Sequence, residues 1–273
     1  IRPLIKAGRL PHLGALLAEG WHTDLLSTTP PVTLPAWTSF LTSAPPARHG
    51  VTDLFVHSPN SYGLEPATGA LRQLPTVLSR LSARGHRVCA LGIPGTYPPE
   101  SVNGICVSGF DAPSANRAGP EAVSPASAFE TLEEAGDWTY NVFNEHSTRP
   151  ERLRSAAEAI LADIERKETT ILKLYRREPW DLFFVHLQAS DTVAHHFWHW
   201  HDPGSPRYDK GAPFDAVARI YERLDQLIGK LRAQLLPESR LLIVSDHGFG
   251  GASTTGVYIN RWLQKEGYLN FLP

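Results

Sequence analysis

The stretch that decides the fold is Asp181-Leu182-Phe183-Phe184-Val185-His186-Leu187, a compact apolar run typical of a buried strand. We interpret it as a central strand of a sheet. A long stretch rich in Ala, Glu, Leu, Lys and Arg precedes it at residues 151–177, which predicts a helix. An amphipathic stretch follows at residues 214–235. Its apolar positions have helical spacing: Val217, Ile220, Leu224, Leu227, Ile228 and Leu231.

Strand-like and helix-like stretches also alternate over the rest of the chain, which favours an α/β fold with a mostly parallel sheet. The other predicted strands are residues 21–27, 87–93, 103–107 and 241–244. The other predicted helices are residues 11–20 and 74–83. Two regions rich in Pro and Gly, residues 94–120 and 201–213, are interpreted as long connections.

Composition excludes several classes of protein. The 273 residues carry 26 Lys and Arg against 28 Asp and Glu, a net charge of −2, which argues against a nucleic-acid coat or a polybasic membrane binder. No apolar run reaches the roughly 18 residues of a transmembrane segment. Two cysteines are too few for a disulfide framework. Oligomeric state and compartment stay open, with a cytoplasmic location only slightly favoured over removal of a signal peptide.

Acid and imidazole groups follow two of the predicted strands, where the sites of open α/β sheets gather. Asp191 and His195 come after 181–187, four residues apart and so one helical turn from each other. The adjacent Asp246 and His247 come after 241–244. If the strands lie close and parallel, these groups converge and suit Zn²⁺ or Mn²⁺. Either motif alone is more often an ordinary turn than a metal site, and together the residues leave both interpretations open.

A third candidate is Thr33, in the sequence Val32-Thr33-Leu34-Pro35. A helix that begins near Pro35 places Thr33 at its N-terminus, because Pro suits the first helical turn. The unpaired amides there favour an anion. Beside a bound metal, a Thr hydroxyl can ionise and attack phosphorus. The alternative is that Thr33 is an ordinary helix cap.

In their order and spacing these motifs resemble the alkaline phosphatase superfamily, in its type I phosphodiesterase/nucleotide pyrophosphatase branch. Residues 32–40 resemble the nucleophile segment, and Arg48-His49-Gly50-Val51 resembles the His-Gly turn that follows it. Residues 94–99 and 107–110 resemble a segment of the bacterial and archaeal members. Asp191 to His195 resembles the Asp-x-x-x-His metal motif, and residues 245–249 resemble the Asp-His-Gly metal motif.

The resemblance implies an alkaline-phosphatase-like three-layer sandwich with a mostly parallel central sheet. It forms one catalytic domain over residues 1–273, with a cap-like insertion at about 54–144. Thr33 is then the nucleophile and also contacts the second of two divalent metal ions, with Zn expected and Mn as the alternative. Asp191 and His195 bind the first metal; Asp246 and His247 bind the second.

The implied reaction is hydrolysis of a phosphodiester or pyrophosphate bond in a small phosphorylated substrate. It proceeds through a covalent phospho-threonine. The nucleotide-cleaving members use an Asn soon after the His-Gly turn. Here that region is Thr52-Asp53-Leu54-Phe55, so nucleotide specificity does not follow, and we expect His49 to be structural.

Two further ligands of the family have no counterpart in the sequence: an Asp in a Leu-Asp-Gly segment of the first strand and a later His. We expect them before Ile1 and after Pro273, so that the domain is incomplete at both ends. The lack of any Met agrees with a fragment.

Other interpretations are a phosphomonoesterase or phosphomutase of the same superfamily, and a non-catalytic binding domain that keeps the fold. A sulfatase is disfavoured because Trp37 stands where that branch has Arg. Several histidines and tryptophans follow His195, and we expect them to form a rim of the cleft: His196, Trp198, His199, Trp200 and His201.

Overall fold

The central sheet is built on strand β3 (Val88–Ile93), whose six residues are all buried. The computed structural model describes residues 1–58, 61–113, 116–140, 150–211 and 214–271. β3 runs parallel to β4 (Gly104–Ser108) and to β6 (Leu182–Val185), and β5 (Val123–Ser124) pairs antiparallel with β4. The order β5-β4-β3-β6 is therefore a mixed, mostly parallel sheet of four strands.

Helices and short elements surround this sheet, and the predicted helices and the predicted strands 87–93 and 103–107 are confirmed with small shifts at their ends. None of the helices in the described ranges is long and apolar enough to cross a bilayer. In chain order the other elements are α1 (Arg2–Lys6), α2 (Pro11–Glu19), α3 (Thr33–Thr42), α4 (Pro46–His49), β1 (Phe55–His57), β2 (Leu64–Pro66), η1 (Gly69–Leu71), α5 (Val77–Ser82), η2 (Pro120–Ala122), α6 (Ala128–Ala135), α7 (Pro150–Arg177), α8 (Ala189–His201), α9 (Ala216–Arg232) and α10 (Ile259–Lys265).

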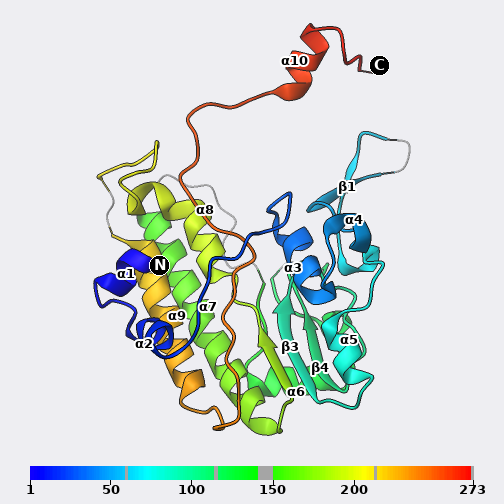
Figure 1. Cartoon of the computed structure of the whole chain (residues 1–273), viewed down its shortest axis with the longest axis vertical. Coiled ribbons are helices and arrows are strands. Elements are labelled where there is room, and N and C mark those ends of the chain that lie inside the picture. Colours follow the sequence, from blue (N-terminus) through cyan, green and yellow to red (C-terminus); the bar gives the residue numbers. More distant parts are fainter. Residues whose placement is uncertain (59–60, 114–115, 141–149, 212–213, 272–273) are drawn as a thin grey trace.

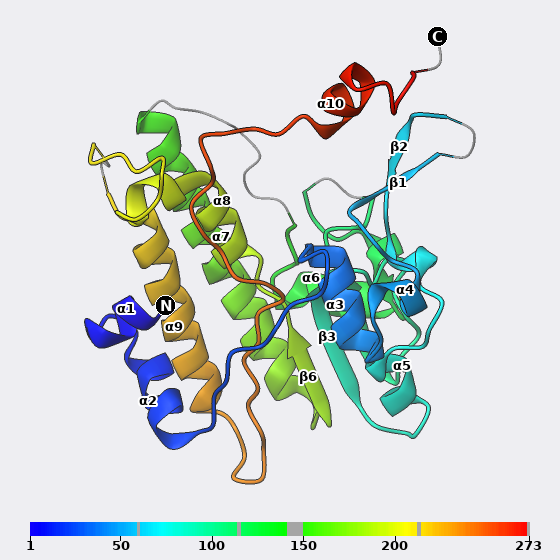
Figure 2. The same ribbon diagram turned by 45° about the horizontal axis from the view of Figure 1, so that its top comes forward.

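Alternate residues of β3 face two separate hydrophobic cores, as the two-residue period of a strand requires. Cys89 and Leu91 belong to the larger core, which residues of α6, α7, α8 and α9 complete. Val88 and Ala90 belong to a second core with Trp37 of α3 and with α5. Figures 1 and 2 show α7, α8 and α9 on one side of the sheet and α3 and α5 on the other. Helices thus cover both faces, which explains why the strand is apolar throughout.

Two of the predicted strands are wrong. Residues 21–27 and 241–244 form no strand, and most of their apolar side chains are open to solvent, with Trp21 87% and Leu242 73% exposed. A strand persists only where a neighbour takes its backbone hydrogen bonds, and neither segment pairs with the sheet. The prediction that 181–187 is a central strand is also wrong. β6 lies at an edge of the sheet, because β3 is its only partner within the described ranges.

The region 54–144 holds elements of two kinds. β1 and β2 form an antiparallel hairpin apart from the main sheet, whereas β3 and β4 belong to that sheet. Residues 59–60, 114–115 and 141–144 of this region lie outside the described residues, as do residues 212–213 of the predicted connection 201–213. The cap within 54–144 therefore stays a prediction.

A buried carboxylate ties the N-terminal helices to α9. Asp225, 1% exposed, accepts hydrogen bonds from the backbone N–H groups of His12 (3.1 Å) and Leu13 (2.7 Å). Both groups lie in the first turn of α2, whose N-cap residue Leu10 has no side chain that could accept them. Asp225 thus supplies the cap that the sequence of α2 lacks.

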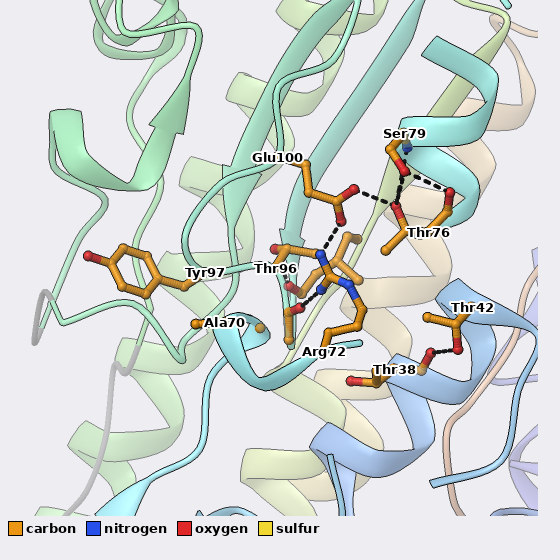
Figure 3. A network of polar contacts seen from close by, with 12 residues as sticks. Thr38, Thr42, Ala70, Arg72, Thr76, Ser79, Thr96, Tyr97 and Glu100 are labelled. Atoms are coloured by element: carbon orange, nitrogen blue, oxygen red, sulfur yellow. Dashed lines mark hydrogen bonds and ion pairs between the residues drawn. The ribbon is translucent and has the colours of Figure 1, made fainter. Parts of the chain in front are cut away.

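The loop after β3 packs tightly on α3. Gly95 has φ +79, and a Cβ there would lie 2.8 Å from Oγ1 of the buried Thr38. Arg72 donates to the carbonyl oxygen of Gly95 and to Glu100 Oε1 (2.8 Å), and Thr76 donates to Glu100 Oε2. Figure 3 shows this network between the start of α5 and the loop. Since the side chains of Arg72 and Glu100 are only 10% and 12% exposed, the pair is nearly removed from water.

We expect Arg72→Ala to lower the free energy of unfolding by about 3 kcal/mol, because it leaves a nearly buried carboxylate without its partner. Denaturant unfolding measures this change. Arg84→Ala, at an exposed position, is the matched control and should change stability by roughly 0.5 kcal/mol or less. Equal effects of the two variants would show that the Arg72–Glu100 pair has no special role.

Candidate functional site

Helix α8 carries two of the predicted residues on one turn. It starts soon after β6 ends, so Asp191 lies in its first turn and His195 lies one turn later. Nε2 of His195 is 3.4 Å from Oδ1 of Asp191. The four-residue spacing therefore brings the two side chains together, as the sequence predicted.

The loop at residues 245–249 returns to α8 although no strand leads into it. Ser27 Oγ donates to the carbonyl oxygen of Asp246 at 2.6 Å. The ring of Phe249 packs edge-on against His195 at 4.9 Å and lies 5.1 Å from the ring of Trp198. The two ring contacts of Phe249, which the strand prediction did not include, thus hold the loop beside α8.

Thr33 is the first residue of α3, two positions before Pro35. The N-cap residue is Val32, so the interpretation of Thr33 as a helix cap is wrong. Thr33 Oγ1 instead lies 3.4 Å from Nε2 of His247. The hydroxyl therefore faces the loop at 245–249.

All five predicted site residues lie in one cluster drawn from three distant segments. His247 is its centre, because its Nε2 is 3.4 Å from Thr33 Oγ1, 3.4 Å from Asp246 Oδ2 and 3.9 Å from Asp191 Oδ1. His195 joins through Asp191. The structure brings the residues together; their catalytic and metal-binding roles stay predictions.

The cluster has more acceptors than donors. The His247 Nδ1 lies 2.9 Å from the carbonyl oxygen of Gly248, which can only accept, so Nδ1 carries the proton and Nε2 has the lone pair in the neutral ring. This lone pair faces carboxylate oxygens of Asp191 and Asp246. Asp191 Oδ1 is buried and has no hydrogen-bond partner within the described part of the chain. Buried acceptors that face one another require a proton or a cation between them.

The side-chain types of these residues suit divalent metal ions, although their positions do not form a ready-made metal site. Carboxylate oxygens and imidazole nitrogens are common ligands of Zn²⁺, and a ligating His typically donates its other N–H to a carbonyl, as His247 does. In the ranges that the structure describes, no three His, Cys, Asp or Glu side chains are spaced as a ready-made metal site.

The charges of the cluster shift its pKa values in opposite directions. Burial alone would raise the pKa of Asp191, but contact with His195 and the charges of the neighbouring histidines lower it overall. Contact with Asp191 raises the pKa of His195. Burial raises the pKa of Asp246, which lies close to a second carboxylate. Asp191 and His195 thus favour their charged forms, whereas the surroundings of Asp246 disfavour its charged form.

His49 is a structural residue, as the sequence predicted. It is fully buried; its Nδ1 accepts from the Val51 N–H (3.2 Å), so Nε2 carries the proton in the neutral ring and donates to Ser39 Oγ (2.9 Å). Ser39 is part of α3, so His49 holds the His-Gly turn against the helix that begins with Thr33.

Sequence reasoning gave no role to Phe249 or to Gln188, which precedes α8. Gln188 Nε2 donates to Asp191 Oδ2 at 2.7 Å. Its position three residues before a predicted ligand was the available signal. In the expected rim, Trp198 contacts Phe249, and His201 pairs with Asp215 at 3.0 Å.

Comparison with known proteins gives a match to a family model over nearly the whole chain. The model of the family described as type I phosphodiesterase / nucleotide pyrophosphatase matches residues 2–272. None of the curated protein sequences matches. Phosphonoacetate hydrolase from Sinorhizobium meliloti 1021 is similar in structure, at 18% identity and TM-score 0.49 in complex with phosphonoformate, and at 17% and 0.47 in complex with phosphonoacetate. Each match covers 84% of this chain and 49% of that one, so the chain spans about half the length of these structures.

The burial of His49 generates a pH prediction. Burial lowers the pKa of His49 in the folded state, so the unfolded state takes up the proton first as pH falls below about 6.5. The free energy of unfolding therefore decreases below that pH, with a slope of at most about 1.4 kcal/mol per pH unit from this group. Urea unfolding between pH 7 and 5 should show a shallower slope for His49→Gln than for the exposed control His57→Gln. An unchanged slope in His49→Gln would contradict the assignment.

Proposed function

Because the chain belongs to the type I phosphodiesterase/nucleotide pyrophosphatase family of the alkaline phosphatase superfamily, we propose that it hydrolyses phosphodiester or pyrophosphate bonds with Thr33 as nucleophile. The observation that carries this proposal is the 3.4 Å contact between Thr33 Oγ1 and His247 Nε2, amid the carboxylates of Asp191 and Asp246. The fold proposed with it is the three-layer sandwich of the superfamily, as one catalytic domain with a cap within residues 54–144.

The site would hold two divalent ions, with Zn²⁺ or Mn²⁺ as the candidates. Asp191 and His195 would bind one ion, and Asp246, His247 and the oxygen of Thr33 the other. When bound, such ions act as Lewis acids that lower the pKa of a hydroxyl and neutralise charge on phosphoryl oxygens.

The proposed reaction has two chemical steps, in which Thr33 and the first turn of α3 have separate roles. Thr33 gives its proton to solvent and attacks phosphorus; the Thr33–O–P bond forms while the bond from phosphorus to the leaving oxygen breaks, and the leaving oxygen takes up a proton from solvent. Water cleaves the phospho-threonine in the second step and returns the hydroxyl. The first turn of α3 adds unpaired amides beside the phosphoryl group, which favour its negative charge. Small phosphorylated diesters or nucleotide-like compounds are the proposed substrates.

Two alternatives keep parts of this proposal. A phosphomonoesterase or phosphomutase would use the same nucleophile on a different substrate. A non-catalytic domain would have no need for unpaired acceptors around a hydroxyl, because buried polar groups without partners cost free energy. The acceptor-rich cluster therefore favours a cation-binding site over a domain that keeps only the fold.

We expect Thr33→Ala to abolish hydrolysis of bis-p-nitrophenyl phosphate, measured on the full-length protein with Zn²⁺ or Mn²⁺. Thr33→Ser keeps a hydroxyl and should keep part of the activity. Thr42→Ala, on the same helix, removes a hydroxyl that donates to the Thr38 carbonyl oxygen and should leave turnover unchanged. Turnover indifferent to Thr33 would refute the nucleophile. No turnover of the diester by the wild type would favour monoester substrates or the non-catalytic domain.

Metal removal should lower thermal stability, because ions that bind only the folded state stabilise it. A free ion at 100 times its dissociation constant contributes about 2.7 kcal/mol. Melting curves of chelator-treated protein should therefore shift upward when Zn²⁺ or Mn²⁺ is added. The shift should shrink in Asp191→Asn and Asp246→Asn and persist in Asp53→Asn, whose side chain is exposed. Equal shifts in all three variants would place metal binding elsewhere.

A further inference from the structure

Gln188 lies at the turn between β6 and α8, next to the cluster but outside its predicted residues. Its Nε2 donates to Oδ2 of Asp191 at 2.7 Å. A carboxylate can only accept, so the NH₂ end of the amide must face Asp191 and the carbonyl end must point away. The hydrogen bond thus fixes the orientation of the amide as well as that of the carboxylate.

This hydrogen bond gives the two oxygens of Asp191 different surroundings. Oδ2 accepts from Gln188. Oδ1 is left facing the cluster, 3.4 Å from His195 Nε2 and 3.9 Å from His247 Nε2, and has no hydrogen-bond partner among the described residues. An oxygen held in this way is ready to bind a cation.

Gln188 also lines a small cavity that is partly open. Gln188 Oε1 is buried, and no donor in the described ranges reaches it. The hydroxyl of Tyr140 is buried and unpartnered in the same way. Both residues line one cavity of about 10 Å³, together with Lys167 and His186. This volume matches a single water molecule, which needs two to four polar partners.

Lys167 is held mainly by other groups. Its Nζ is 2.8 Å from Asp163 Oδ2 and lies 5.3 Å from the centre of the Trp138 ring. Its side chain is 5% exposed, and that of Asp163 4%. The ion pair with Asp163 uses one of the three N–H groups of Lys167, so Lys167 and the hydroxyl of Tyr140 are both donors at the cavity.

We propose that Gln188 is a positioning residue for the metal ligand Asp191, and that a buried water joins its Oε1 to the Tyr140 hydroxyl. The inference rests on the proposed function, because it assigns Asp191 to a metal ion. Tyr140, the water, Gln188 and Asp191 form a chain of hydrogen bonds in which each member restrains the next. Supporting groups of this kind typically contribute 10–100-fold to metal affinity or activity.

The test is a titration of the metal-free, full-length protein with Co²⁺ alone, followed by its visible absorption. The spectrum reports both affinity and coordination geometry. Gln188→Met keeps the length of the side chain and removes both hydrogen bonds. We expect it to weaken Co²⁺ binding about 10–100-fold and to alter the absorption bands. Tyr140→Phe removes one hydroxyl and should weaken binding less. Gln264→Met, at an exposed position on α10, is the matched control and should titrate like the wild type.

The outcomes separate this inference from the proposed function. Co²⁺ uptake by the wild type with unchanged affinity and spectrum in Gln188→Met overturns the positioning role alone. No Co²⁺ uptake by the wild type overturns the metal site and the inference together. Should Gln188→Met not fold, Tyr140→Phe decides: weaker binding supports the relay, and wild-type binding overturns it. A lower melting temperature without a change in Co²⁺ binding marks a purely structural residue and also overturns the proposal.

Discussion

The burial of β3 on both faces is the constraint on which the other elements depend. A strand with no exposed side must have apolar residues at every position and helices on each face. Cys89 and Leu91 anchor the layer that includes α8, whereas Val88 and Ala90 anchor the layer that includes α3. The two helices that contribute to the cluster are therefore positioned by opposite faces of one strand. Their side chains Thr33 and Asp191 are joined through His247 of the loop at 245–249.

Much of this fold could be predicted from local pattern, because helices such as α7 and α9 show their buried face within their own sequence. Strands depend on partners elsewhere in the chain. The run Leu241-Leu242-Ile243-Val244 is as apolar as a buried strand, yet its first three residues stay exposed because no strand in the described part of the chain pairs with it. Position within a sheet is equally non-local, which is why the apolar β6 lies at an edge rather than in the centre.

The proximity of Asp191, His195, Asp246 and His247 could be predicted from spacing and residue type, whereas their roles stay predictions. What spacing could not show was how their protons are arranged. The tautomer of His247 follows from its contact with the Gly248 carbonyl, and the orientation of Gln188 follows from its bond to a carboxylate. Both depend on three-dimensional contacts of ordinary residues, which carry no motif of their own.

The contact between Thr33 and His247 spans 214 residues. Contacts of such long sequence separation demand that most of the intervening chain be ordered first, because closing a long loop costs entropy before the contact repays it. Thr33, the proposed nucleophile, and its neighbours should therefore come together late in folding. A ribosome-bound or half-folded chain would contain Thr33 without His247, and so would lack the cluster. The arrangement makes the cluster a property of the completed fold rather than of any single segment.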